Sequence, residues 1–207
     1  KCNYALKIQN ISKENDKRVF DSECQYSEVL SRKYNIGPKF IARWECNNFG
    51  TQYGFIVTEK WDKTLNEIIT SGNSKQICGA NFIQKLYGQI QNIHKENLIH
   101  ADILPKNVLV KVNSKDEITD ITLADFGLMR STESWLQYPK AKEEDAMLDV
   151  ETMFKYFTNP VSGAPANKYF IDRNVTLEMV QQNPKHLDIA LIWVLLKNEK
   201  AALYPYN

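Results

Sequence analysis

The N-terminal part of the chain shows a strand pattern, then a helix pattern, then two more strand patterns. Residues 3–8 (N-Y-A-L-K-I) alternate as a half-buried strand does. Residues 19–34 have helical periodicity, and the Gly37-Pro38 pair ends that helix. Residues 40–45 and 53–59 again favour strands. The predicted order is therefore strand, helix, strand, strand.

From residue 61 onward the pattern indicates helices around one hairpin. Residues 65–69 predict a short helix and residues 80–95 a longer one. The apolar residues of the longer helix, which we expect in the core, are Phe82, Ile83, Leu86, Tyr87, Ile90 and Ile93. Apolar runs at 108–112 and 121–124 bracket polar residues and predict a β-hairpin. Further helices are predicted at residues 149–158, 177–182 and 186–202.

Composition and charge exclude several classes of protein. The chain has 207 residues, 43% of them hydrophobic and 25% charged, which is enough apolar surface for a sizeable core. Its formal net charge of +1 gives no general attraction to nucleic acid or anionic membranes. The apolar run at 189–196 is too short to span a bilayer. We therefore expect neither nucleic acid nor membrane as a partner.

The cysteine pattern indicates a reducing compartment. The four cysteines have no C-x-x-C spacing, and the three histidines do not cluster with them, so a structural zinc site is not expected. Free thiols are the simplest interpretation. This interpretation predicts an intracellular, cytoplasmic protein, or a virion component if the protein is viral.

Two motifs lie on either side of the predicted hairpin. Residues 98–110 read L-I-H-A-D-I-L-P-K-N-V-L-V, and residues 123–127 read L-A-D-F-G. Either motif alone is compatible with an ordinary turn. Together, in the order helix, H-x-D-x-x-x-x-N, hairpin, D-F-G, they resemble the catalytic loop and metal motif of protein kinases. The combination is specific because few other folds require this order.

The resemblance implies transfer of the γ-phosphoryl group of ATP with the help of Mg²⁺. Asp102 would be the base or the residue that orients the attacking hydroxyl. Asp125 would be the principal magnesium ligand and Asn107 a further one, since Mg²⁺ prefers hard oxygen ligands. His100 would be a structural brace.

The N-terminal strand and helix resemble the phosphate-binding elements of the same family. Ala5-Leu6-Lys7 is similar to the V-A-I-K strand, which implies that Lys7 holds the α- and β-phosphates and pairs with a helix glutamate. Glu23 is the favoured partner because it shares the inward helix face with Phe20. Glu28 is the alternative, although it falls off that face.

The segment I-V-T-E-K-W at residues 56–61 is similar to the kinase hinge. By this resemblance Thr58 would be the gatekeeper, and the Glu59 carbonyl and Trp61 amide would face the adenine of ATP. The alternative interpretation is an ordinary strand end, with Trp61 in the core.

The fold implied is α+β and two-lobed. Residues 1–60 would form a small N-lobe with an antiparallel sheet and one helix, and residues 61–207 a mostly helical C-lobe. The strands of the glycine-rich loop would precede Lys1 and are therefore missing from this sequence.

The sequence also departs from the family pattern in the C-lobe. Ala101 replaces an arginine, and Leu104 a lysine, although Lys106 lies two residues later. No A-P-E motif precedes Asp149, which resembles the start of the long C-lobe helix, with Asp145 as the alternative. This reduced form, rich in lysine and asparagine, resembles kinases of large DNA viruses.

Three functions are compatible with these motifs. The first is a serine/threonine protein kinase, which the intact Lys7, Asp102, Asn107 and Asp125 favour. The second is a pseudokinase that acts as a binding scaffold, which the missing glycine loop favours. The third is a small-molecule kinase similar to aminoglycoside or choline kinases, and the intact D-F-G motif argues against it.

Overall fold

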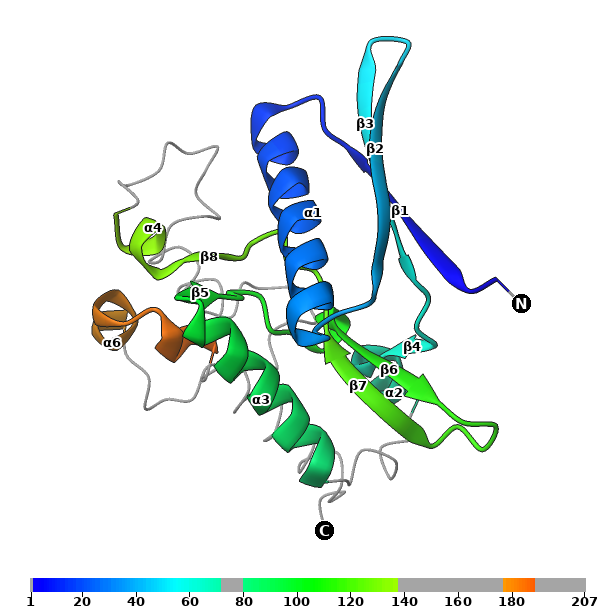
Figure 1. Cartoon of the computed structure of the whole chain (residues 1–207), viewed down its shortest axis with the longest axis vertical. Helices are drawn as coiled ribbons and strands as arrows, with labels where there is room; N and C mark the ends of the chain where they lie inside the picture. Colours follow the sequence, from blue (N-terminus) through cyan, green and yellow to red (C-terminus); the bar gives the residue numbers. More distant parts are fainter. Residues whose placement is uncertain (1, 72–79, 138–176, 189–207) are drawn as a thin grey trace.

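The computed structural model describes residues 2–71, 80–137 and 177–188. Its N-terminal part is an antiparallel sheet in the order β1-β3-β2, with one long helix beside it (Figure 1). These elements are β1 (Tyr4–Asn10), α1 (Glu14–Tyr34), β2 (Phe40–Asn48) and β3 (Thr51–Glu59). The predicted order of strand, helix, strand, strand is confirmed.

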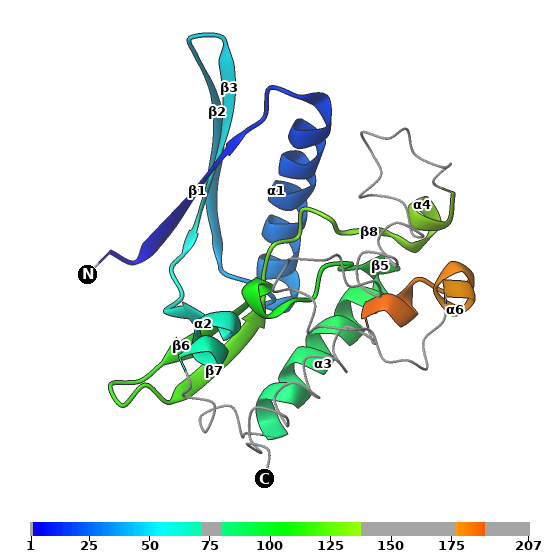
Figure 2. The ribbon, with the colours of Figure 1, turned by 180° about the vertical axis from the view of Figure 1, so that it is seen from behind.

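The second part contains helices and the predicted hairpin, which pairs with a short strand in the order β4-β6-β7 (Figure 2). A second short sheet joins β5 to β8. The elements are β4 (Lys63–Thr64), α2 (Leu65–Thr70), α3 (Ala80–Lys95), β5 (Leu98–Ile99), the 3-10 helix η2 (Pro105–Asn107), β6 (Val108–Val112), β7 (Ile118–Leu123), β8 (Arg130–Ser131), α4 (Thr132–Gln137) and α6 (Leu177–Gln182). The whole is an α+β fold in two parts, as predicted.

Helix α1 starts five residues earlier than the apolar pattern predicts, because its first turn is polar. Glu14 and Asp16 lie in that turn and Arg32 and Lys33 in the last, so both ends suit the helix dipole. At the end of the helix Asn35 adopts a left-handed conformation, with φ of 53°, and its N–H donates to the carbonyl of Leu30.

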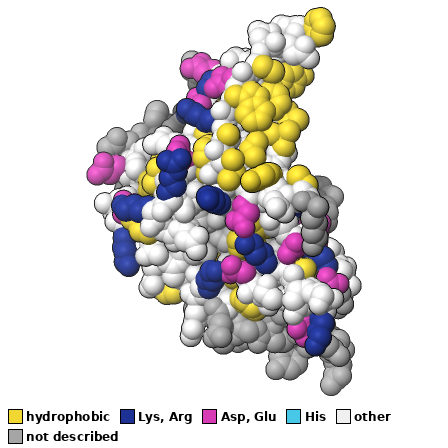
Figure 3. All heavy atoms as spheres, turned by 45° about the vertical axis from the view of Figure 1, so that its right-hand side comes forward, with side chains coloured by type: hydrophobic (Ala, Val, Ile, Leu, Met, Phe, Trp, Pro, Cys, Tyr) yellow, Lys and Arg dark blue, Asp and Glu magenta, His cyan; other side chains and the backbone are white. Residues whose placement is uncertain are grey.

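The sheet has one face on α1 and one face in solvent. Phe20 of α1 lies directly over Gly54 of β3, where a Cβ atom would come within 2.5 Å of the phenyl ring. The opposite face exposes apolar side chains, which gather on the upper part of the molecule in Figure 3. The ring of Trp44 stacks there on Phe55 of the neighbouring strand, with centroids 5.0 Å apart.

Helix α1 belongs to two apolar clusters. Its N-terminal half contributes Phe20 and Cys24 to a small cluster under the sheet. Its C-terminal end contributes Leu30, and the loop that follows contributes Ile36, to the large cluster of the second part. The helix therefore fixes the position of the sheet relative to the rest of the chain.

The long helix α3 has the predicted bounds and buries three residues of the predicted face. Leu86, Ile90 and Ile93 are buried, but the expectation for Tyr87 is wrong, because its side chain is 43% exposed. Tyr87 lies at the margin of the apolar stripe, where an amphipathic ring remains in contact with water. None of the helices in the described ranges is long and apolar enough to cross a membrane.

The close contact between Gly54 and Phe20 gives a stability prediction. Gly54→Ala should lower the free energy of unfolding by about 1–3 kcal/mol, because the added methyl group would overlap the ring. Gly88→Ala is the matched control, since a Cβ at position 88 of α3 meets no atom within 4 Å. It should be neutral or stabilise the chain by up to about 1 kcal/mol. Urea unfolding measures both changes, and equal effects would contradict the packing described here.

Candidate active site

The loop after β5 and the 3-10 helix η2 that follows hold the first pair of predicted site residues. The side-chain Nδ2 of Asn107 donates to the main-chain oxygen of Asp102 at 2.9 Å and to its Oδ2 at 2.7 Å. The Asp102 side chain is only 13% exposed. The carbonyl of Asn107 also accepts from the N–H of Ala124 at 2.8 Å, which ties this loop to the segment that carries Asp125.

Two residues of the site have a backbone conformation that is unusual for non-glycine residues. Ala101 has φ of 65° and Asp125 has φ of 61°. The left-handed region costs an L-residue roughly 1–2 kcal/mol, so surrounding contacts must hold these residues in place. The conformation of Ala101 directs the side chain of the next residue, Asp102, and the conformation of Asp125 directs its own carboxylate.

The carboxylate that holds the loop is Asp188, which the sequence analysis missed. Its side chain is fully buried and accepts from the main-chain N–H groups of His100 and Ala101, both at 2.8 Å. It also contacts Nε2 of His94 at 2.9 Å. The helix start predicted at Asp149, with Asp145 as the alternative, lies outside the described ranges.

A sequence signal for Asp188 did exist. The residue directly precedes the longest apolar run of the C-terminal region, residues 189–196. A charged residue beside an apolar run needs hydrogen-bond donors wherever it is buried.

His100 is placed as a brace, in agreement with the role that the resemblance implies. The residue is fully buried, and its Nε2 lies 3.2 Å from the carbonyl oxygen of Ala124. Its ring lies against the ring of Phe126, with centroids 5.4 Å apart. These contacts connect the catalytic loop with the D-F-G segment from the inside of the protein.

Lys7, Glu23 and Asp125 meet from three different elements. The Lys7 Nζ donates to both carboxylate oxygens of Glu23 at 2.7 Å and lies 3.6 Å from Oδ1 of Asp125. The alternative glutamate, Glu28, is instead paired with Arg32 on the same helix. The structure thus brings Lys7 to the glutamate that the helix geometry favoured.

The electrostatics of this cluster favour a charged lysine. Burial alone would lower the pKa of Lys7, but the carboxylates of Glu23 and Asp125 outweigh it, and the pKa is raised above its ordinary value. Burial raises the pKa of Glu23, and the Lys7 ammonium opposes that rise. The short contacts to both oxygens of Glu23 favour the ionised pair.

Asp102 has the electrostatic character of a base. Burial raises the pKa of its carboxyl, and the charge of Asp125 adds to the rise. The Lys106 ammonium, 4.0 Å from Oδ2, opposes it. A carboxylate with a raised pKa accepts a proton more readily than an ordinary aspartate does.

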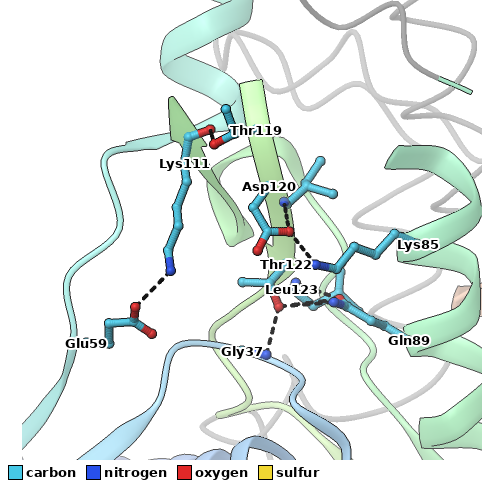
Figure 4. A network of polar contacts seen from close by, with 10 residues as sticks. Gly37, Glu59, Lys85, Gln89, Lys111, Thr119, Asp120, Thr122 and Leu123 are labelled. Atoms are coloured by element: carbon cyan, nitrogen blue, oxygen red, sulfur yellow. Dashed lines mark hydrogen bonds and ion pairs between the residues drawn. The ribbon is translucent and has the colours of Figure 1, made fainter. Parts of the chain in front are cut away.

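The predicted hinge residues lie at the end of β3 and directly after it. Thr58 pairs with Ala5 of β1, and Glu59 is the last residue of the strand. Glu59 accepts from Lys111 of β6 at 2.8 Å, and the same ammonium lies 4.7 Å from the ring centroid of Trp61 (Figure 4). The Trp61 Nε1 is buried and has no hydrogen-bond partner in the part of the chain that the structure describes.

A cavity of about 190 Å³ borders the site beside α1. Its lining is Arg18, Val19, Ser22, Gly127, Met129, Arg130 and Ser134. It touches the D-F-G segment through Gly127 but is not lined by Asp102 or Lys7, so it is separate from the cluster of charged groups.

The oxygen donors at Asp125 and Asn107 fit magnesium. Mg²⁺ is commonly bound by one or two protein oxygens together with substrate phosphates, so two such residues suffice. Because Asn107 uses its Nδ2 toward Asp102, its amide oxygen is left for a cation. In the described ranges no group of three or more His, Cys, Asp or Glu residues could hold a metal on its own.

Comparison with known proteins gives a consistent result. A family profile described as "Protein kinase domain" matches residues 1–145. Calcium-dependent protein kinase 4 of Plasmodium falciparum is 32% identical over 131 residues, which cover 60% of this chain and 23% of that protein. Myosin light chain kinase A of Dictyostelium discoideum is 26% identical over 132 residues, covering 63% of this chain and 43% of that protein.

The chain belongs to the protein kinase family, since the family profile covers well over half of it. It spans less than half the length of the curated relatives described above. A solved structure of the bifunctional kinase-methyltransferase WbdD is also similar, with a TM-score of 0.47, 18% identity and coverage of 100% of this chain and 43% of that chain.

The role of Asp188 gives a prediction that does not depend on activity. Asp188→Asn keeps the size of the side chain but turns a donor toward the N–H groups of His100 and Ala101. Stability should fall by about 1–3 kcal/mol, the usual cost of a buried polar group without its partner. Denaturant unfolding measures the change.

The matched control is Asp116→Asn. Asp116 is exposed and pairs with Lys63, and Asn tolerates its positive φ. An exposed ion pair is worth about 0–1 kcal/mol, so the control should change stability little. Similar losses in both variants would show that Asp188 is not a special anchor.

Proposed function

We propose that this chain is an active kinase that transfers the γ-phosphoryl group of ATP to a serine or threonine hydroxyl of a protein. One observation carries the proposal. Lys7 lies between Glu23 of α1 and Asp125 of the D-F-G segment. The ammonium group proposed to bind phosphate is therefore next to the carboxylate proposed to bind the metal. A scaffold protein has no need for this arrangement.

In the proposed mechanism Lys7 binds the α- and β-phosphates, and Glu23 holds its ammonium in position. Asp125 and Asn107 hold Mg²⁺, which when bound neutralises charge on the phosphates. The segment from Thr58 to Trp61 holds the adenine. The nucleotide would then lie between the proposed lobes, residues 1–60 and 61–207.

Asp102 acts as the base toward the attacking hydroxyl. The hydrogen bond from Asn107 fixes its carboxylate, and its raised pKa favours proton uptake. Lys106 places a positive charge close to Asp102, where it would face the transferred phosphoryl group. This lysine compensates in part for Leu104, which stands where the family usually has a lysine.

The partners we propose are ATP and a protein substrate. The three described cysteines, Cys2, Cys24 and Cys46, are free thiols, which supports our proposal of a reducing, cytoplasmic location. The viral resemblance of the sequence stays a prediction.

Substitution of the charged cluster tests the proposal directly. With labelled ATP, Mg²⁺ and peptide pools containing Ser, Thr or Tyr, we expect transfer to Ser and Thr by the wild-type chain. Lys7→Met and Asp125→Asn should each lower transfer at least about a hundredfold, because each removes a group that binds phosphate or metal. Lys115→Met and Asp116→Asn, both at exposed positions between β6 and β7, should keep activity.

Three other outcomes would each contradict the proposal. Mg-ATP binding without transfer would identify a pseudokinase. Transfer to hydroxylated metabolites alone would identify a small-molecule kinase. Unchanged transfer in Asp125→Asn would show that the activity does not come from this site.

The neighbourhood of Asp102 predicts a shift in the pH profile. Because the Lys106 charge lowers the pKa of Asp102, Lys106→Met should raise that pKa further and move the acid limb of kcat/KM to higher pH. Lys106→Arg keeps the charge and should leave the limb in place. A limb that stays unmoved in Lys106→Met would argue against Asp102 as the titrating base.

A further inference from the structure

A buried polar network joins the loop after α1 to the strand that leads to Asp125 (Figure 4). The Oγ1 of Thr122 accepts from the main-chain N–H of Gly37 at 2.8 Å and from Nε2 of Gln89 at 3.2 Å. The Oε1 of Gln89 accepts from the N–H of Leu123 at 3.0 Å. Thr122 is 2% and Gln89 6% exposed, so water cannot replace these bonds.

Two members of the network are connected along the chain to elements that carry site residues. Gly37 follows α1, the helix that carries Glu23, and Thr122 lies three residues before Asp125. Gly37 also touches the D-F-G segment, because a Cβ there would come within 2.8 Å of the Phe126 ring. One threonine hydroxyl therefore connects the loop after α1 with the strand that leads to Asp125.

The same interface contains a second, outer contact that serves as an internal control. Lys85 and Gln89 are one turn apart on α3, and Asp120 and Thr122 are on the same face of β7. Lys85 pairs with Asp120 at the solvent-exposed end. An exposed ion pair restrains position weakly, whereas a buried and fully paired hydrogen-bond network restrains it strongly.

We propose that Thr122, together with Gln89, is a positioning residue of the kinase reaction, which holds the Gly37 loop and hence Glu23 and Lys7 in register with Asp125. The proposal rests on the proposed function for its kinetic consequence. The hydrogen bonds of Thr122 and Gln89 in this network involve no atom of the Thr58 to Trp61 segment, so the proposal concerns alignment of the phosphates rather than binding of the adenine.

Isosteric substitution separates the hydroxyl from its methyl group. Thr122→Val leaves the N–H of Gly37 and Nε2 of Gln89 without an acceptor, whereas Thr122→Ser keeps the acceptor. For Thr122→Val we expect kcat to fall roughly tenfold with KM for ATP changed less than about twofold, since only alignment is lost. Thr122→Ser should retain kcat.

Two controls exclude a purely structural effect. Lys85→Met removes the outer contact of the same interface and should leave kcat unchanged. Ile93→Val lowers stability from a buried position of α3 without touching the network and should also leave kcat unchanged below the Tm. The proposal is overturned if Thr122→Val keeps kcat, or if Thr122→Ser or Ile93→Val loses as much.

A second readout does not require phosphoryl transfer. The rate of Lys7 acetylation, followed by mass spectrometry, reports the contact of Lys7 with Asp125. It should rise in Thr122→Val but not in Thr122→Ser or Ile93→Val. If the wild-type chain transfers no phosphate, the proposed function fails, but the positioning role is still decided by this rate. Equal rates in all variants would overturn it.

Discussion

The arrangement of the site depends on one buried carboxylate, Asp188. A fully buried charge is stable only when it is surrounded by donors, and two main-chain N–H groups and the His94 ring supply them. The same bonds hold Ala101 in a left-handed conformation that alanine does not choose freely. The direction of the Asp102 side chain follows from that strained residue, so the loop has its shape because Asp188 is buried beneath it.

Helix α1 likewise fixes the position of a site carboxylate, that of Glu23. Phe20 near its start packs on the sheet and Leu30 near its end packs in the large cluster, with Glu23 between them. Because apolar contacts fix both ends of the helix, the Glu23 carboxylate has a fixed position relative to the rest of the site. The hydrogen bond from Gly37 to Thr122 also restrains the loop after α1, because a hydrogen bond fixes a direction whereas apolar contacts do not.

The sequence allowed prediction of what depends on local pattern. The alternation in β1, the periodicity of α3 and the two motifs identified the elements, and the inward face of α1 favoured Glu23 over Glu28. Long-range pairing was not accessible in this way. Thr122 and Gln89 are polar residues that a pattern assigns to the surface, and only the fold shows that their partners are buried. The prediction for Tyr87 was wrong for the opposite reason, because its ring lies at the edge of the apolar stripe of α3 and is partly exposed.

The balance of charge in the site supports the need for a bound cation. Glu23, Asp102 and Asp125 bring three carboxylates together, against the ammonium groups of Lys7 and Lys106 within the described part of the chain. Asp125 already raises the pKa of Asp102, so the negative charges compete before any nucleotide is present. The phosphates of ATP would add to this excess. A dication at Asp125 and Asn107 would offset it and at the same time lower the pKa of Asp102, so that more of this carboxylate would be ionised when the nucleotide is bound.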